Sequence, residues 1–441
     1  MTTGRAAALE RRYAAALTRL YALQSLGIRM GASRMHAALA FRGHPERGQR
    51  FVLVGGTNGK GSASAMIAAC LTRAGHRTGL FTSPHLHRYV ERVRIDGRPL
   101  GRGEAATRID ELLAAFARKG APDTTFFELT TLLAIEAFRD HRCDIAVLEV
   151  GLGGRLDATN AVAPLVSVIT RVALDHTHIL GDTVAAIAHE KAGIVKRGVP
   201  AVIGARDPAA LRVIVRRSRR VGAPVLLIDR DFEVLPQPSP RRFAVRVRGR
   251  VIDRLRTRLA GAHQYENAAC AVAALDALRR TGLVIRDAHV REGLARVRWP
   301  GRLEHVSGRP AFLFDAAHNA DGCAALARHL QHDARPRSAR ARRVLIFGAM
   351  ADKQYPEMLR LLRPLVDRVF YCPPDVRRAA SSAQLQRVTA GTPTRGTADA
   401  LARARRAAGP RGEVIVAGSI FLVADARARV LGLRSDPLIR M

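Results

Sequence analysis

Short apolar runs alternate along this chain with longer segments that have the hydrophobic period of a helix. The apolar runs are rich in β-branched residues and end at glycine, proline or polar residues, a pattern typical of buried strands. They occur at residues 51–54, 144–150 and 164–176, and again near the C-terminus at 311–315, 344–350 and 413–419. The alternation predicts an α/β protein with a parallel central sheet and a second, smaller α/β unit.

Helical periodicity is present between these runs, and one segment alternates with the period of a strand instead. We predict helices at residues 6–26, 62–75, 103–119, 128–139, 182–198 and 263–278. Residues 243–255, FAVRVRGRVIDRL, predict a β-hairpin because apolar and polar positions alternate on both sides of Arg248-Gly249.

The chain of 441 residues is too long for one ordinary core, so two or three domains are expected. A Pro300-Gly301 pair interrupts the pattern after the helical segment that ends near Val297. We therefore predict one domain at residues 1–298 and a second at 299–441.

The formal net charge of +34 first suggests a nucleic-acid partner. The arginines are spread over the whole chain, however, without a dense basic tract. Only five basic residues are lysine: Lys60, Lys119, Lys191, Lys196 and Lys353. Because arginine cannot readily lose its proton, a lysine retained within a motif is a candidate for a chemical role. We expect no nucleic-acid partner.

Cysteine usage and hydropathy indicate the cellular compartment of the protein. The five cysteines are scattered and form no CxxC pair, which favours buried free thiols over disulfides or zinc. No apolar run approaches membrane-spanning length, and no secretory leader is evident. The expectation is a cytoplasmic protein without a membrane partner.

The most informative stretch is FVLVGGTNGKGS, Phe51 to Ser62. A strand, a glycine-rich loop and a helix follow one another here, which is the arrangement that cradles phosphate with backbone N–H groups and a helix N-terminus. Lys60 would place a charge on the terminal phosphates, and the Ser62 hydroxyl could reach Mg²⁺. The alternative, a tight structural turn, is much less favoured in this context.

Polar residues also follow other predicted strands. Glu149 closes the strand at 144–150 beside a second glycine-rich turn, and a buried carboxylate there suits Mg²⁺, which prefers oxygen ligands. His176 closes the next predicted strand. On composition alone, residues 82–97 are a solvated loop, and Phe126 and Phe127 at a helix start are core residues.

Several strings together carry a family resemblance. GTNGKGS, TSPHL with ERV, EVGLGGRLDATN, EKAGI, PGRLE and FDAAHN occur in that order along the chain. They resemble the Mur ligase superfamily and, within it, folylpolyglutamate and dihydrofolate synthases. The resemblance implies an N-terminal P-loop ATPase domain with a parallel central sheet and a smaller Rossmann-like C-terminal domain.

The resemblance also implies roles for individual residues. ATP would be bound by Thr57, Asn58, Gly59, Lys60, Gly61, Ser62, Asn267, Arg302 and Asp315. Two Mg²⁺ ions would be held by Ser83, Glu149, His176 and Lys191, with Lys191 carbamylated. The pteroate side would involve Arg29, Phe126, Phe127, Glu128 and Arg155. Lys60, His176, Lys191 and Arg302 would take part in catalysis, and His318 is the candidate base.

The implied reaction joins L-glutamate to the carboxylate of a folate or of dihydropteroate, with ATP forming an acyl phosphate, in a monomeric enzyme. One alternative is a Mur-type ligase acting on UDP-MurNAc-peptides. The other is a basic nucleic-acid-binding NTPase. The pteroate-side segments match too loosely to separate a bifunctional enzyme from one that only extends polyglutamate.

Overall fold

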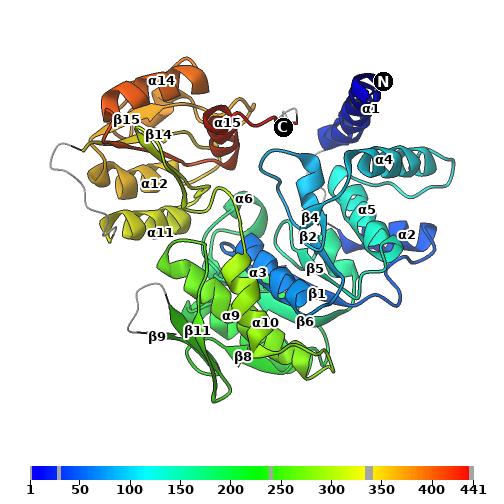
Figure 1. The fold of residues 1–441 in the computed structure, drawn as a ribbon. Helices are drawn as coiled ribbons and strands as arrows, with labels where there is room; N and C mark the ends of the chain where they lie inside the picture. Colours follow the sequence, from blue (N-terminus) through cyan, green and yellow to red (C-terminus); the bar gives the residue numbers. More distant parts are fainter. Residues whose placement is uncertain (1, 27–30, 238–241, 333–340, 437–441) are drawn as a thin grey trace.

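A computed structural model describes residues 2–26, 31–237, 242–332 and 341–436 of this chain. Within these ranges the chain forms three β-sheets, and the helices pack around them (Figure 1). The largest has the order β4-β3-β2-β5-β1-β6-β7-β8 and is parallel from β2 to β8. Its strands are β1 Phe51–Gly55, β2 Thr78–Phe81, β3 Val93–Ile95, β4 Arg98–Pro99, β5 Ile145–Glu149, β6 Pro164–Ile169, β7 Ala201–Ile203 and β8 Val225–Leu227.

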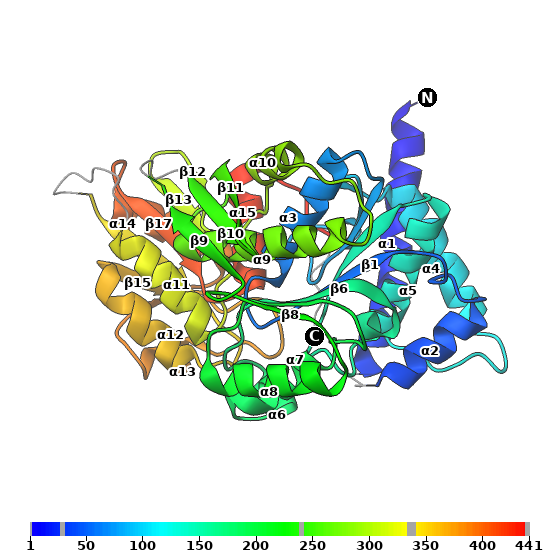
Figure 2. The same ribbon diagram turned by 90° about the horizontal axis from the view of Figure 1, so that it is seen from below.

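Helices cover both faces of this sheet, so its central strands are apolar on both sides. In β1, Phe51 and Leu53 pack into one core while Val52 and Val54 pack into the other. Figure 2 shows the two helical layers on either side of the strands. One layer contains α1 Thr2–Ala22, α2 Ala32–Phe41, α4 Arg102–Phe116, α5 Phe126–Asp140, α7 Val184–Ala192 and α8 Pro208–Arg220; the other contains α3 Lys60–Arg73, α9 Ala262–Arg279 and α10 Asp287–Arg296.

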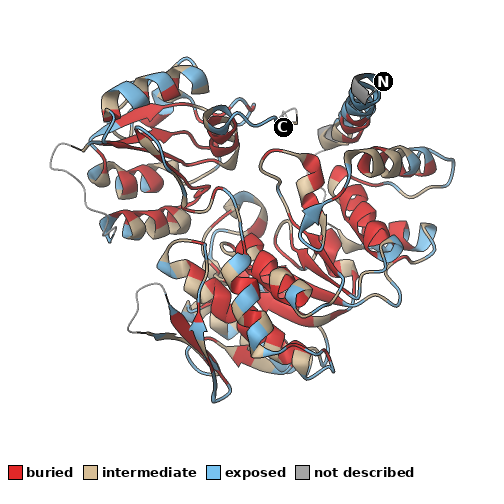
Figure 3. Ribbon diagram, viewed as in Figure 1, coloured by how far each residue is buried: buried red, intermediate tan, exposed pale blue. Residues whose placement is uncertain are grey.

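A small antiparallel sheet packs into the same core as α9. It has the order β11-β10-β9, with β9 Phe232–Pro236, β10 Phe243–Val247 and β11 Arg250–Leu255. The predicted hairpin at 243–255 is therefore confirmed. Figure 3 shows how fully α3, α9 and the central strands are buried.

The third sheet begins after residue 303 and has the order β12-β13-β17-β14-β15-β16. Its strands are β12 Glu304–Val306, β13 Ala311–Phe314, β14 Arg343–Phe347, β15 Arg368–Tyr371, β16 Thr392–Pro393 and β17 Glu413–Ala417. Only β12 runs antiparallel to its neighbour. The helices around it are α11 Ala320–Gln331, α12 Tyr355–Leu362, α13 Ser382–Gln386, α14 Thr397–Ala408 and α15 Ile420–Leu431.

The predicted fold class is confirmed, and two local predictions need correction. The strand expected at 164–176 ends at Ile169, so Asp175 and His176 lie in the loop before the short helix α6 Thr177–Leu180. His176 has a left-handed backbone with φ 50°. Part of the loop expected at 82–97 forms β3, which extends the sheet antiparallel to β2.

No helix in the described part of the chain is both long and apolar enough to cross a membrane.

Candidate active site

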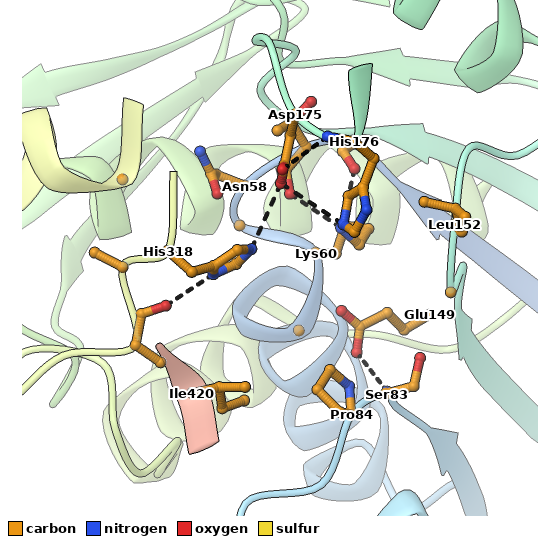
Figure 4. Close-up of a pocket in the computed structure, with 18 of the residues that line it drawn as sticks. Asn58, Lys60, Ser83, Pro84, Glu149, Leu152, Asp175, His176, His318 and Ile420 are labelled. Atoms are coloured by element: carbon orange, nitrogen blue, oxygen red, sulfur yellow. Dashed lines mark hydrogen bonds and ion pairs between the residues drawn. The ribbon is translucent and has the colours of Figure 1, made fainter. Parts of the chain in front are cut away.

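A cavity of about 1080 Å³ lies where the carboxyl ends of the large parallel sheet face the C-terminal sheet. Open α/β sheets place ligands at this edge because parallel strands deliver their following loops to the same side. Figure 4 shows the phosphate loop, Glu149 and His318 arranged around one space. The lining includes Thr57, Asn58, Gly59, Lys60, Gly61, Ser62, Ser83, Glu149, His176, Lys191, Asn267, Arg302, Asp315 and His318.

The phosphate loop leaves β1 and enters α3 at Lys60. Gly59 has φ 90°, and a Cβ there would lie 2.2 Å from Asn267 Oδ1, so the loop requires glycine at this position. Lys60 Nζ donates to the carbonyl oxygens of Gly56 and Thr57, both at 3.0 Å. Burial lowers the pKa of Lys60, against the opposing charges of Glu149 and Asp175. An anion bound in the loop would supply a negative charge that balances this buried ammonium group.

Glu149 and Ser83 lie side by side at the ends of β5 and β2. The backbone N–H of Ser83 donates to Glu149 Oε2 at 3.1 Å. Glu149 is buried, and burial raises its pKa although Lys60 and the Ser83 N–H oppose the shift. A carboxylate and a hydroxyl at a water-poor position suit a Mg²⁺ ion, which would replace the lost hydration of Glu149.

His176 faces the same space from the loop after β6. Burial, with the adjacent Lys353 ammonium, lowers the pKa of His176 to about 3, so the imidazole is neutral at physiological pH. Its Nε2 lies 3.1 Å from Lys353 Nζ. Within the described ranges, no three His, Cys, Asp or Glu side chains converge as a metal-binding group. Because Lys353 contacts the His176 Nε2 that a cation would need, this arrangement fits an ion at Ser83 and Glu149 better than at His176.

Lys191 reaches the cavity from the last turn of α7. Its ammonium group is buried and donates to the Gly56 carbonyl at 2.9 Å. Burial lowers its pKa to about 7, and the charge of Lys60 adds to the shift. The lowered pKa favours the neutral, nucleophilic amine of Lys191 more than at an exposed lysine.

Residues at the start of α11 and in the loop before it complete the wall around the phosphate loop. Asn58 donates from Nδ2 to Asn319 Oδ1 at 3.0 Å and to Asp321 Oδ2 at 2.8 Å. Arg171 Nε donates to Asp321 Oδ1 at 2.6 Å. His318 Nε2 lies 3.5 Å from Asp175 Oδ2, with Nδ1 against its own loop at the Ala316 carbonyl.

Arg302 lies just before β12, and Asp315 directly follows β13. Asp315 accepts the backbone N–H groups of Leu303 at 2.7 Å and Ala317 at 2.9 Å, which fixes its carboxylate at the cavity wall. The positive charge of Arg302 acts on both Lys60 and Glu149. Asn267, on α9, holds its amide against Gln264 Oε1 at 3.0 Å.

The residues expected on the pteroate side separate into three groups. Phe126, Phe127 and Glu128 line the cavity at the start of α5. Glu128 also caps that helix through Thr125 and pairs with Arg34 at 3.0 Å, so it has a structural task. Arg155 is absent from the described lining, contrary to our expectation, because its guanidinium pairs with Glu190 on α7 at 2.8 Å. Arg29 lies outside the described residues.

Sequence reasoning assigned no specific site role to several residues that build this site. Lys353, Asn319, Asp321, Arg171, His85 and Arg92 all contribute side chains to it, and each lines the cavity or contacts a residue that does. Lys353 carried a signal as one of five lysines in the chain, and His85, Arg92 and Asn319 lie within the motifs TSPHL, ERV and FDAAHN. Their partners in the site are distant in sequence, so the sequence did not indicate which contacts they make.

Comparisons with known proteins agree with this geometry. The Mur ligase middle domain matches residues 54–275, and the Mur ligase, glutamate ligase domain matches residues 301–420. Dihydrofolate synthase/folylpolyglutamate synthase of Bacillus subtilis is 33% identical over 415 residues, or 92% of this chain and 96% of the relative.

Solved structures of similar proteins match almost the whole chain. Escherichia coli FolC in complex with DHPP and ADP superposes with a TM-score of 0.86 at 32% identity, covering 95% of this chain and 98% of that one. A bifunctional folylpolyglutamate synthase/dihydrofolate synthase with Mn, AMPPNP and L-glutamate bound has a TM-score of 0.85 at 31% identity, with coverages of 95% and 98%. The chain belongs to the dihydrofolate synthase/folylpolyglutamate synthase family of Mur ligases.

Proposed function

We propose that this protein is an ATP-dependent ligase that joins the amine of L-glutamate to the carboxylate of a folate, and to that of dihydropteroate. The observation that carries the proposal is the juxtaposition of a phosphate loop, a buried carboxylate at Glu149 and an aromatic wall at Phe126 and Phe127 around one cavity. The ligands bound to family members, ADP with DHPP and AMPPNP with L-glutamate, have the chemistry that this cavity offers.

The reaction begins with phosphoryl transfer, which demands positioning and charge neutralisation from the protein. The substrate carboxylate oxygen attacks the γ-phosphorus of ATP, the bond to the bridging oxygen breaks, and ADP leaves. Lys60 and the backbone N–H groups of residues 57–62 hold the phosphates, and Arg302 adds positive charge from the other side. The product of this step is an acyl phosphate.

The second step forms the amide bond. The glutamate nitrogen attacks the acyl carbon, gives up a proton, and inorganic phosphate leaves with both electrons of the C–O bond. His318 is our candidate to receive that proton because it lines the cavity. Its two ring nitrogens lie against Asp175 Oδ2 and the Ala316 carbonyl, so one of these contacts has to open before the ring can accept a proton. The opposed sheets exclude water from the acyl phosphate, which would otherwise hydrolyse.

A divalent cation would be held by Ser83 and Glu149, with His176 as a further ligand if Lys353 withdraws. Such an ion neutralises charge on the phosphates when bound. Family members bind Mn with AMPPNP. We also propose that the neutral amine of Lys191 is carbamylated by CO₂ and contributes a carboxylate toward a second ion.

Domain division, assembly and location are further parts of the proposal. We divide the chain near residue 298, supported by the family matches that end at 275 and resume at 301. A monomer in the cytoplasm remains our prediction.

The test is ADP release with Mg²⁺ and L-glutamate, comparing tetrahydrofolate with dihydropteroate as acceptor. Turnover with both supports a bifunctional enzyme, and turnover with tetrahydrofolate alone restricts it to polyglutamate extension. If neither acceptor stimulates ADP release above the background without acceptor, the proposed function is wrong.

A further inference from the structure

Arg92 is a buried guanidinium whose charge has no carboxylate partner among the described residues. It ends the short 3₁₀ segment η2 Tyr89–Arg92, is 3% exposed, and lines the cavity. Burial lowers its pKa, and the negative charges of Glu149 and Glu91 act on it only from a distance. Burying an unpaired charge is costly, so such a residue indicates a partner that arrives with a ligand.

The side chain is fixed by a single hydrogen bond and two aromatic rings. Arg92 Nε donates to His85 Nδ1 at 2.9 Å. Because arginine can only donate, His85 must accept through a neutral ring. The guanidinium carbon lies 5.3 Å from the Phe126 ring centroid and 6.0 Å from that of Tyr89. These contacts hold the guanidinium in place and leave Nη1 and Nη2 without an acceptor in the described chain.

Two free Nη groups on one rigid plane match a carboxylate, which they can bind through parallel hydrogen bonds. A folate that already ends in glutamate presents two carboxylates. The γ-carboxylate must reach the ATP phosphates near Lys60. The α-carboxylate is attached to the carbon next to the benzamide nitrogen, so it stays close to the aromatic part of the substrate. The Phe126 ring beside Arg92 is part of the cavity's aromatic wall.

We propose that Arg92 binds the α-carboxylate, the one that does not react, of the terminal glutamate of the folate substrate, with His85 as its positioning residue. This inference rests on the proposed function, and it makes Arg92 a residue that discriminates between acceptors. Dihydropteroate has only the reacting carboxylate, so it makes no such contact.

The test compares two acceptors that differ only in this group. The first is tetrahydrofolate; the second is its analogue in which 4-aminobutyrate replaces glutamate, so that the reacting carboxylate is kept and the α-carboxylate is missing. For R92Q we expect the KM for tetrahydrofolate to rise about 10- to 100-fold, the loss typical of a charge-assisted contact. The KM values for the analogue, ATP and L-glutamate should change by less than about 3-fold.

Two further variants make the result specific. R92K keeps the charge but loses the planar fork, and it should recover only part of the discrimination. R98Q removes the same charge from the exposed strand β4 of the same segment, and it should behave as wild type. ATP-induced stabilisation against heat, measured on each variant, shows that the fold and the nucleotide site are intact; if R92Q does not fold, R92K carries the comparison.

Each other outcome overturns the proposal. Equal losses with tetrahydrofolate and the analogue would assign Arg92 to the reacting carboxylate, and a raised KM for L-glutamate alone would assign it to the incoming amino acid. Wild-type kinetics in R92Q would leave Arg92 without a binding role. If wild-type protein uses neither acceptor, the proposed function fails first, and that result is seen before any variant is compared.

Discussion

Lys353 donates a hydrogen bond to Asp175, although 178 residues separate them in the chain. Asn319 Nδ2 donates to the other carboxylate oxygen of Asp175 at 2.9 Å. Burial alone would raise the pKa of Asp175, but the hydrogen bond and charge of His318 and the charge of Lys353 outweigh it and hold that pKa well below its usual range. A loop of the large sheet is thus tied to the C-terminal sheet through one ionised carboxylate.

The K353M variant tests this tie. The substitution removes the positive charge that pairs with the buried Asp175 carboxylate. We therefore expect the free energy of unfolding to fall by about 3 kcal/mol and kcat to fall. Urea unfolding at pH 7 measures the first quantity. The D175N substitution should destabilise the wild type more than it destabilises K353M, because the two side chains interact. Additive losses would show that they do not.

The E149Q variant tests the proposed metal position. The amide keeps the shape and can still accept from Ser83, but it lacks the charge that attracts a divalent cation. We expect kcat/KM for ATP to fall at least about 100-fold at saturating acceptor. Mn²⁺ binding in the presence of AMPPNP, followed by electron paramagnetic resonance, should weaken in parallel. Unchanged Mn²⁺ affinity would exclude Glu149 as a ligand.

The G59A variant tests the phosphate loop. The added Cβ would collide with Asn267, and the residue would keep a left-handed φ. G75A is a matched control, since Gly75 has φ 88° but nothing within 4 Å of its Cβ position. Both should lose about 1 kcal/mol of stability from backbone strain, and only G59A should lose ATP affinity, as measured by calorimetry. Equal ATP affinity in both variants would contradict the role assigned to the loop.

The lowered pKa of Lys191 predicts that the free energy of unfolding depends on pH. Its pKa is about 7 in the folded chain against 10.5 in the reference state. Between these values the unfolded chain binds more protons, so stability in CO₂-free buffer should rise with pH by at most about 1.4 kcal/mol per unit. K191M should flatten this rise between pH 7 and 9. An identical slope in both proteins would place the pKa of Lys191 elsewhere.

CO₂ should act on the same group. Carbamylation needs the neutral amine, which predominates above pH 7. We expect activity at pH 8 to fall in CO₂-depleted buffer and to return on addition of bicarbonate, with a ¹³C carbamate signal that K191M lacks. Full activity after depletion, without that signal, would exclude the modification.

The C-terminal segment provides a last prediction. Asp436 Oδ2 accepts from Tyr13 Oη on α1 and from the Tyr89 backbone N–H, both at 2.7 Å. Burial, together with Asp436, raises the pKa of Tyr13. D436A leaves both donors unpaired and should cost about 1–3 kcal/mol in thermal or urea unfolding. Y13F should cost less, and in its background D436A should cost less than in wild type; independent effects would contradict the contact.

Local sequence determined the elements and the parts of the site carried by contiguous motifs. Strand, glycine loop and helix at 51–73 follow from hydrophobic period and glycine placement, and so does Glu149 at the end of β5. These features need only near neighbours in the chain, which is why pattern reasoning finds them. The same reasoning misplaced Asp175 and His176 at a strand end, because the apolar residues Val172 and Leu174 continue the pattern beyond the point where pairing stops.

Only the tertiary structure decided which distant side chains meet. Arg155 and Arg92 are both arginines in motif-bearing loops, yet one pairs with Glu190 and the other is buried in the cavity without a carboxylate among the described residues. Lys353 reaches Asp175 because the C-terminal sheet faces the loop after β6. The energy of a charge depends on burial and on partners in space. The sequence by itself determined the fold class and the phosphate loop, and packing between the sheets determined the electrostatics of the site.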